Sequence, residues 1–373
     1  MPVFVCAAYR RAHRDMLLPV TQEHTIMEQK REAVQQEKPF DSYLITGATG
    51  LVGSSLAEFL VSRGHKVTCF VRPNSDVGFL RSLKVRLVEG DLSIPYSIEK
   101  AASGVDVVFH CAAMVSDWAD RETMTKINVG GTEKIIKACL QNKTKRMIML
   151  SSLAVLGMDK QDNANESAPY VYTGDNYNYS KIEAEKRVMQ ACIDHKLPAV
   201  IIRPPYIYGV RDRQLLPRVV SALREKKFKF IGDGKNPISM VYVKNLVQAL
   251  YLASYKKNAV GQIYHITDGN DISRREFIET ITQKLGIETP QAHVPVPIAK
   301  LMCHILEKFQ KISGSKKPPL LNKFRMKFMD TYLTFDISKA QRDLGYTPEY
   351  TFRQGLQEAL EWFEHGDRIP AGV

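Results

Sequence analysis

The sequence lacks several features that define whole classes of protein. It has no apolar run approaching the roughly 20 residues that a helix needs to span a bilayer. Its six cysteines are scattered along the chain and form no Cys-x-x-Cys pair, so neither a disulfide framework nor a zinc site is indicated. We therefore expect a cytoplasmic protein with reduced thiols and no metal.

Acidic residues are fewer than basic ones, 40 against 52, which gives a formal net charge of +12. The excess is spread along the chain and no nucleic-acid-binding motif accompanies it, so we expect no nucleic-acid partner. A basic solvated surface is the simplest explanation of the charge. Peripheral contact with an anionic membrane, or an anionic ligand, is the alternative.

The 373 residues can form a full hydrophobic core, and an apolar content of 44% with a charged content of 25% is ordinary for a globular enzyme. Residues 1–41 differ from the rest, because they are polar and carry Arg10, Arg11 and Arg14 near the start. We expect a poorly ordered extension with no catalytic role. An organelle transit peptide, or translation that begins at a later methionine, is the alternative.

A glycine-rich turn organises the rest of the chain. Tyr43–Thr46 is a short apolar run typical of a buried parallel strand, and Gly47, Gly50 and Gly53 then open a helix that ends near Arg63. The first glycine allows a sharp turn, the second lets a pyrophosphate approach the backbone, and the third lets the helix pack closely on the strand. The free N–H groups at the start of the helix would hold the phosphates. Together they predict a dinucleotide site.

Strand and helix patterns alternate after this turn. The alternation predicts an α/β fold, a Rossmann-type doubly wound parallel sheet with a smaller C-terminal substrate-binding part. We place an NAD(P)-binding domain with the catalytic residues at 42–210 and a mainly substrate-binding α/β part at 211–373. The expected elements are strands at 66–71, 85–89, 105–110, 146–150, 199–203, 228–231 and 240–243, helices at 121–141, 177–192, 214–225, 244–254 and 274–285, and a polar loop at 158–176.

The end of the second strand bears on the choice of cofactor. NAD enzymes usually carry a carboxylate there that binds the ribose 2′-hydroxyl, but Val71 and Arg72 stand at this position. An arginine would attract a 2′-phosphate that a carboxylate would repel. We therefore expect a preference for NADP(H), with NAD(H) as the alternative if Arg72 only covers the edge of the sheet.

Tyr177 and Lys181 lie four residues apart on a predicted helix, so both point to the same face. An ammonium beside a phenol stabilises the phenolate, and we therefore expect a lowered Tyr177 pKa and a proton donor and acceptor near neutral pH. Lys181 could also bind a cofactor ribose, and Ser152 could hold a substrate oxygen. Such Tyr–Lys pairs are often merely solvated, but the position of this one between the fifth and sixth strands favours catalysis.

Seven short motifs follow one another along the chain. They are Thr46-Gly-Ala-Thr-Gly-Leu-Val-Gly53, Gly90-Asp91-Leu92, His110-Cys-Ala-Ala113, Asn128-Val-Gly-Gly-Thr132, Ser151-Ser152, Tyr177-x-x-x-Lys181 and Arg203-Pro204-Pro-Tyr-Ile-Tyr-Gly209. In this order they resemble the extended short-chain dehydrogenase/reductase family. The resemblance covers about residues 42–365, and the combination of motifs is highly specific.

The resemblance implies a role for each matching residue. Ser152, Tyr177 and Lys181 would be catalytic, with Asn128 supporting the lysine through water. Ser152 is preferred to Ser151 because it stands five residues before a glycine, as the catalytic Ser or Thr of the family does. Similar proteins usually form homodimers through the helices that follow the fourth and fifth strands. With the glycine turn and the second-strand arginine included, the expected cofactor-binding residues are Gly47, Thr49, Gly50, Leu51, Val52, Gly53, Arg72, Asp91, Leu92, Ala112, Ala113, Tyr177, Lys181 and Pro204.

Two features of the nucleotide-sugar epimerases and dehydratases are missing. Their Arg-x-x-Asn after the sixth strand is here Arg203-Pro-Pro-Tyr206, and their Arg-Asp-Phe is here Ile238-Ser-Met240. Without those polar groups a buried diphosphate would be poorly held. The C-terminal part is instead similar to the 3β-hydroxysteroid dehydrogenase-like reductases of hydrophobic ketones. The similar pieces are Pro295-Val-Pro297, Lys317-Pro-Pro-Leu320 and Asp336-Ile-Ser-Lys-Ala-Gln-Arg-Asp-Leu-Gly-Tyr346.

Large apolar and aromatic residues follow the strands on the cofactor side. Met114, Val115, Trp118 and Tyr206 are candidates to line an apolar substrate pocket beside Ser152. Ordinary packing of loops explains them equally well.

The segment 298–312 has the apolar spacing of an amphipathic helix. Packing against the core is the first interpretation of its stripe, and a lid or a membrane-facing surface is the second. Basic residues surround the segment against only Glu307 and Asp330, as in an interfacial helix. They are Lys300, Lys308, Lys311, Lys316, Lys317, Lys323, Arg325 and Lys327.

The sequence therefore predicts an NADP(H)-preferring oxidoreductase. It would transfer a hydride between the nicotinamide and a hydrophobic small molecule, a steroid-like or lipid-like secondary alcohol or ketone, with Tyr177 as general acid and base. A nucleotide-sugar epimerase or dehydratase is the first alternative. A non-enzymatic NAD(P)-binding sensor is the second, and the presence of both Tyr177 and Lys181 argues against it.

Overall fold

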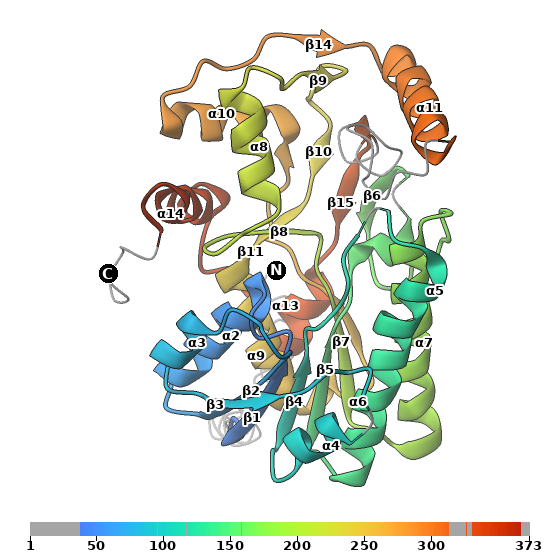
Figure 1. Cartoon of the computed structure of the whole chain (residues 1–373), viewed down its shortest axis with the longest axis vertical. Coiled ribbons are helices and arrows are strands. Elements are labelled where there is room, and N and C mark those ends of the chain that lie inside the picture. Colours follow the sequence, from blue (N-terminus) through green and yellow to red (C-terminus); the bar gives the residue numbers. More distant parts are fainter. Residues whose placement is uncertain are drawn as a thin grey trace, which may run out of the picture. The chain divides into compact units, whose positions relative to one another are not determined.

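The computed structural model describes residues 38–366 apart from Pro95, Asp117, Met158, 313–325 and 327–329. Its central sheet has seven parallel strands in the order β12-β7-β5-β4-β1-β2-β3 (Figure 1). This doubly wound order confirms the predicted fold class. The strands are β1 Ser42–Thr46, β2 Lys66–Val71, β3 Arg86–Glu89, β4 Val107–His110, β5 Arg146–Leu150, β7 Ala199–Arg203 and β12 Ile263–His265.

Alternate residues of each strand point to opposite faces of the sheet, and helices cover both faces. Ile45 and Phe109 lie in the cluster that α2 and α9 complete, whereas Leu44 and Val108 lie in the cluster on the side of α4, α6 and α7. Burial on both faces explains why the strands are continuous apolar runs. The helices are α2 Leu51–Ser62, α9 Val243–Tyr255, α4 Ser97–Ala102, α6 Gly130–Gln141 and α7 Asn176–His195.

The turn between β1 and α2 requires two of its glycines. Gly47 has a φ of +69°, and a Cβ on it would lie 2.7 Å from the backbone nitrogen of Ala112. A Cβ on Gly53 would overlap the carbonyl oxygen of Gly47. A side chain at Gly47 would therefore push the turn away from the segment after β4, and one at Gly53 would push α2 away from the turn.

The C-terminal part contributes to two regions of the fold. β12 forms the sheet edge beside β7, and α9 packs on α2, so both belong to the cofactor sheet. Most other C-terminal elements lie beyond the carboxyl ends of the strands (Figure 1). The proposed division into 42–210 and 211–373 stays a prediction. The pairs and sheets are β8 Tyr206–Tyr208 with β11 Met240–Tyr242, β14 His293–Val294 with β9 Phe230–Ile231, and β13 Ile272–Ser273, β10 Pro237–Ile238, β15 Leu333–Phe335 and β6 Gln161–Ala164 in that order.

Some local predictions differ from the structure. The predicted loop 158–176 contains β6, which pairs with β15. The predicted helix 121–141 is divided into α5 Arg121–Met124, a π-helical turn Thr125–Val129 and α6. Several strands were missed because two or three residues carry no recognisable period. The remaining helices are α3 Gly78–Ser82, α8 Leu215–Arg224, α10 Arg274–Leu285, α11 Val296–Ile312, α13 Ser338–Leu344 and α14 Phe352–His365.

The interpretation of 298–312 as a core-packed helix is wrong. The buried side of α11 carries the small residues Ala299 and Cys303, which pack near Ile231. Its large apolar side chains are exposed, namely Ile298, Leu301, Met302, Ile305 and Phe309. In the described part of the chain, no helix combines the length and apolarity that a membrane span requires. The predicted basic positions 316, 317, 323, 325 and 327 lie outside the described residues.

The substitution Gly53→Ala should destabilise the protein by about 1–3 kcal/mol, because the added methyl group overpacks the contact between α2 and the turn that follows β1. Chemical denaturation measures the change. Gly130→Ala is the matched control, since the nearest atom to its added Cβ is 4.0 Å away. Equal stability of the Gly53→Ala variant and the unaltered protein would contradict the close packing.

Candidate active site

The four residues expected to be catalytic come from three elements near the carboxyl end of β5. Ser152 follows this strand, Tyr177 and Lys181 lie at the start of α7, and Asn128 lies in the π-helical turn. The structure therefore brings together residues that are far apart in the sequence. The amino end of α7 is fixed by Asp175, whose carboxylate accepts a hydrogen bond from a backbone N–H of the first turn.

Ser152 is better placed than Ser151 for contact with Tyr177. The Ser152 side chain hydrogen-bonds to the Tyr177 hydroxyl, and its Oγ also accepts from the Ala154 backbone N–H at 3.2 Å. Ser151 is buried, and its hydroxyl has no hydrogen-bond partner among the described residues. This geometry supports the choice that the sequence suggested.

Lys181 is buried, and burial lowers its pKa to about 8. Its Nζ donates to the carbonyl oxygen of Leu150 at 2.9 Å and lies 5.9 Å from the centre of the Tyr177 ring. The predicted lowering of the Tyr177 pKa is wrong for this structure, because burial raises that pKa to about 12 and only the Ser152 hydrogen bond opposes the rise appreciably. Removal of the phenol from water raises its pKa more than the charge of Lys181 lowers it, because the Lys181 ammonium hydrogen-bonds to a backbone carbonyl and not to the phenol.

A buried ion pair that sequence reasoning missed lies one helical turn beyond Lys181. Arg203 donates through Nη2 to Glu185 Oε2 at 2.6 Å and through Nε to Oε1 at 3.0 Å, and both side chains are buried. Tyr170 donates to the same carboxylate at 2.9 Å. The charge of Glu185 raises the pKa of Lys181 and so opposes the effect of burial. The spacing of four residues between Lys181 and Glu185 could have indicated that these two charges are neighbours on the helix.

A chain of buried hydrogen bonds joins the glycine turn to the π-helical turn. Thr46 Oγ1 lies 3.0 Å from His110 Nδ1, and His110 Nε2 lies 3.0 Å from Thr132 Oγ1. Thr132 in turn donates to the carbonyl oxygen of Asn128 at 2.7 Å. Burial lowers the pKa of His110 to about 3, so the ring is neutral at physiological pH. The two turns are thus held in one network.

The Asn128 side chain connects two more segments of the candidate site. Its Oδ1 accepts from the backbone N–H of Met114 at 2.7 Å, and its Nδ2 donates to the Met114 carbonyl at 3.0 Å. The same Nδ2 donates to Ser180 Oγ at 2.9 Å, next to Lys181 on α7. In the contacts that the structure shows, Asn128 therefore supports Lys181 indirectly, through the neighbouring residue Ser180 on α7.

The start of α2 has the features that a dinucleotide phosphate requires. Among the described residues no side chain caps the helix, and its first turn contains no acid. The backbone N–H groups of Leu51 and Val52 have no acceptor within the helix, so they can face a phosphate. Gly50 is exposed beside them and Thr49 is partly exposed. The residues of this turn therefore fit the expected cofactor.

The remaining cofactor candidates follow neighbouring strands, whose carboxyl ends lie on one edge of the sheet. Arg72 is exposed after β2. Asp91 follows β3, and a hydrogen bond from the Ser93 backbone N–H at 2.7 Å lowers its pKa, with Arg72 adding to the effect. Ala112 donates its N–H to Thr46 Oγ1 at 3.3 Å. The sheet thus brings the two charged candidates, Arg72 and Asp91, close to each other.

Three further cofactor candidates are apolar. Leu92 packs against the helical glycine Gly131, and Ala113 is half-buried after β4. Pro204 is buried after β7, and its carbonyl accepts from the Leu153 backbone N–H at 2.9 Å. That bond ties the segment after β5 to the segment after β7.

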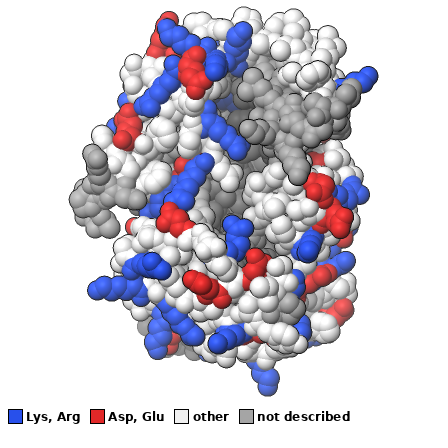
Figure 2. Space-filling view, in the orientation of Figure 1, with Lys and Arg blue, Asp and Glu red and all other residues white. Residues whose placement is uncertain are grey.

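The predicted substrate residues occupy separate segments. Met114 and Trp118 are half-buried after β4, while Val115 is exposed. Tyr206 begins β8, and burial raises the pKa of its hydroxyl while the charge of Arg274 opposes the rise. Figure 2 shows that the molecule is hollowed between the C-terminal elements and the carboxyl ends of the strands, with basic side chains around the hollow. A shared pocket lining stays a prediction.

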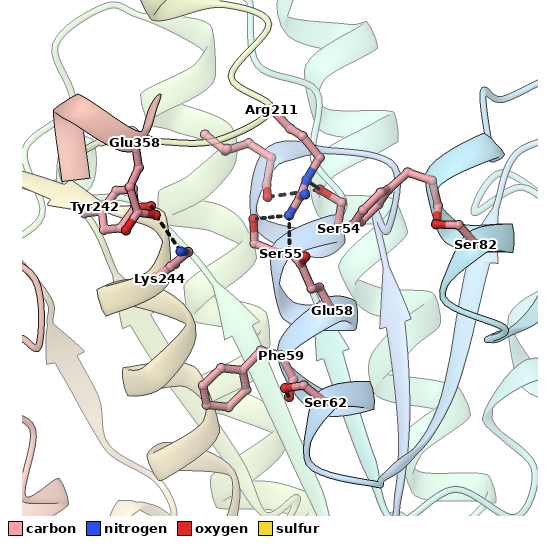
Figure 3. Close-up of polar contacts among 12 residues, drawn as sticks. Ser54, Ser55, Glu58, Phe59, Ser62, Ser82, Arg211, Tyr242, Lys244 and Glu358 are labelled. Carbon is pink, nitrogen blue, oxygen red and sulfur yellow. Dashed lines mark hydrogen bonds and ion pairs between the residues drawn. The ribbon is translucent and has the colours of Figure 1, made fainter. Parts of the chain in front are cut away.

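An arginine after β8 ties its segment to α2 (Figure 3). Arg211 donates to Glu58 Oε2 at 2.6 Å, to Ser55 Oγ at 3.3 Å and to Ser54 Oγ at 3.2 Å. Its guanidinium also lies 4.0 Å from the centre of the Phe79 ring. The residue adopts a φ of +70°, a left-handed conformation that these contacts stabilise.

The fold and the site together define the class of protein. A seven-stranded Rossmann sheet, an uncapped glycine turn and converging Ser152, Tyr177 and Lys181 side chains are the features of an extended short-chain dehydrogenase/reductase. The sequence matches the NAD dependent epimerase/dehydratase family over residues 43–267, and the chain belongs to that family.

Two curated relatives agree with this assignment. The 3beta-hydroxysteroid-dehydrogenase/decarboxylase isoform 1 of Arabidopsis thaliana is 32% identical over 348 residues, which cover 86% of this chain and 79% of that protein. The 2-alkyl-3-oxoalkanoate reductase of Stenotrophomonas maltophilia is 30% identical over 329 residues, which cover 84% of this chain and 97% of that protein. They support the predicted 3β-hydroxysteroid dehydrogenase-like branch.

Solved structures show the same fold. The crystal structure of gox2253 has a TM-score of 0.74 at 29% identity and covers 88% of this chain and 100% of that chain. The UDP-glucuronic acid 4-epimerase of Bacillus cereus in complex with NAD has a TM-score of 0.70 at 21% identity and covers 87% of this chain and 98% of that chain. The two solved structures show the fold, and the family match with the two curated relatives confirms the predicted enzyme class, an NAD(P)-dependent oxidoreductase.

The substitution Glu185→Gln should destabilise the protein by about 3–5 kcal/mol, because it leaves the buried guanidinium of Arg203 without a counter-charge. Thermal or chemical denaturation measures the loss. Glu183→Gln on the same helix is the control, since its partner Lys186 is solvent-exposed and such pairs contribute about 1 kcal/mol or less. Equal losses in the two variants would contradict a special role for the buried pair.

Proposed function

We propose that this enzyme transfers a hydride between NADP(H) and a hydrophobic secondary alcohol or ketone of steroid-like or lipid-like structure. The observation that carries the proposal is the meeting of Ser152, Tyr177 and Lys181 at the end of β5, beside the glycine turn. A bound nicotinamide would supply or accept the hydride. The residues described below bind the cofactor, orient the substrate oxygen and exchange the proton.

Tyr177 transfers the proton to or from the substrate oxygen, and the Ser152 hydroxyl, already hydrogen-bonded to it, orients that oxygen. Lys181 keeps a positive charge near the phenol and binds the cofactor ribose. The phenol of Tyr177, whose pKa burial raises to about 12, is protonated at neutral pH and therefore carries the proton that a ketone would receive. Asn128 positions the helix that carries the pair through Ser180.

The chemistry of three positions supports a hydrophobic substrate. Tyr206 stands where the epimerases carry the asparagine that reaches for the nucleotide. Ile238 and Ser239 stand where the epimerases carry an arginine and an aspartate, and both are buried. These positions offer little to a diphosphate. The names of the two relatives, a steroid dehydrogenase and an oxoalkanoate reductase, point to substrates of the same apolar kind.

The variant Tyr177→Phe should retain NADPH binding yet lose about a hundredfold or more in turnover, because it lacks the transferable proton. NADPH fluorescence measures binding, and NADPH consumption with sterol ketones and long-chain β-keto compounds measures turnover. Tyr179→Phe, two residues further along α7, is the control.

Unchanged turnover in Tyr177→Phe would exclude this mechanism. A purified protein that carries tightly bound cofactor and consumes no external NADPH with any of these ketones would instead indicate an epimerase or dehydratase.

The preference for the phosphorylated cofactor depends on Arg72, which is exposed at the end of β2 where a carboxylate would favour NAD. The variant Arg72→Ala should raise the KM for NADPH about tenfold and change the KM for NADH little, because a charge-assisted contact to the 2′-phosphate is lost. Lys66→Ala, at the opposite end of the same strand, is the control. Parallel changes for both cofactors would contradict the assignment.

A further inference from the structure

The helix α11 exposes its large apolar side chains on one continuous stripe. Residues 298, 301, 302, 305 and 309 recur every three or four positions, so they share one face of the helix. Leu301 is 63% exposed and Phe309 is 69% exposed. Helices of globular proteins usually turn such a stripe inward, and a contiguous exposed patch indicates a binding surface.

The opposite side of α11 shows that this orientation is fixed by packing. Ala299 and Cys303 are buried in a small cluster with Ile231 and Met326. Small side chains allow a close contact there, while the bulky ones would not fit without moving the helix. The helix is therefore attached by its small residues and presents its large ones outward, beside β14 at the outer end of the C-terminal elements (Figure 1).

The charged side chains that the structure describes on α11 are mostly positive, and the sequence that follows is basic. Lys300, His304 and Lys308 are exposed on α11, and Glu307 is the one acidic residue in the sequence from 300 to 329. The same stretch of sequence contains eight lysines and arginines, at 300, 308, 311, 316, 317, 323, 325 and 327. An apolar face bordered by lysines is complementary to a surface that is anionic outside and apolar beneath.

We propose that α11 docks this protein on an anionic lipid bilayer, with the helix lying in the interface and not crossing it. The stripe enters the boundary between headgroups and acyl chains, and the lysines contact the headgroups. A second copy of the chain would bring the same positive charge to the contact, and repulsion opposes that occupant. The inference does not depend on the catalytic assignment.

Vesicle co-sedimentation tests the docking. The full chain should bind vesicles of phosphatidylcholine mixed with phosphatidylglycerol at low ionic strength, and bind pure phosphatidylcholine vesicles less. The double variant Leu301→Asp/Phe309→Asp should bind the mixed vesicles at least about tenfold more weakly. Ile193→Asp on α7 is the matched control, because Ile193 is 64% exposed but stands apart from α11, and it should bind as the unaltered protein does.

The variant Lys300→Glu/Lys308→Glu should lose the preference for anionic vesicles, and added salt should do the same. The proposal is overturned if the full chain binds no vesicles, or if the Leu301→Asp/Phe309→Asp variant binds like the Ile193→Asp control. It is also overturned if light scattering shows that the unaltered protein is a dimer and the double variant is a monomer, since the apolar face would then bind a second copy of the chain. Turnover of a water-soluble ketone, measured in parallel, reports on the catalytic assignment separately.

Discussion

The candidate site depends on the interactions that hold the buried ammonium of Lys181. A charge removed from water is unfavourable unless hydrogen bonds and a counter-charge compensate for it. Here the Leu150 carbonyl accepts from the ammonium, and Glu185 stands one helical turn away. Glu185 is itself neutralised by Arg203. Three parts of the chain, β5, α7 and β7, must therefore meet in one register before Tyr177 has a defined place.

The features that local spacing determines could be predicted from the sequence. The glycines at 47 and 53 are required because the turn and the helix contact leave no room for a Cβ. Tyr177 and Lys181 share a helix face because they are four residues apart. The apolar strands and the family motifs then indicated the sheet and the class of enzyme. Each of these inferences needs only residues that are close together in the chain.

The features that distant contacts determine could not be predicted in the same way. The direction of the Tyr177 pKa shift depends on how completely the fold buries the phenol, and the spacing of Tyr177 and Lys181 does not contain that information. Glu185 meets Arg203 only because α7 packs beside β7. The periodicity of α11 showed that one face is apolar, but the small residues Ala299 and Cys303 decide which face turns toward the protein.

The position of β12 has a consequence for biosynthesis. Ile263–His265 pairs with Ile201–Arg203 and completes the sheet from a point far along the chain. While the ribosome is still making the intervening segment, β7 presents unpaired backbone groups at the edge of the sheet. The central sheet is therefore incomplete until residues 263–265 have been made. Until then, the edge of β7 is a surface that a chaperone would protect.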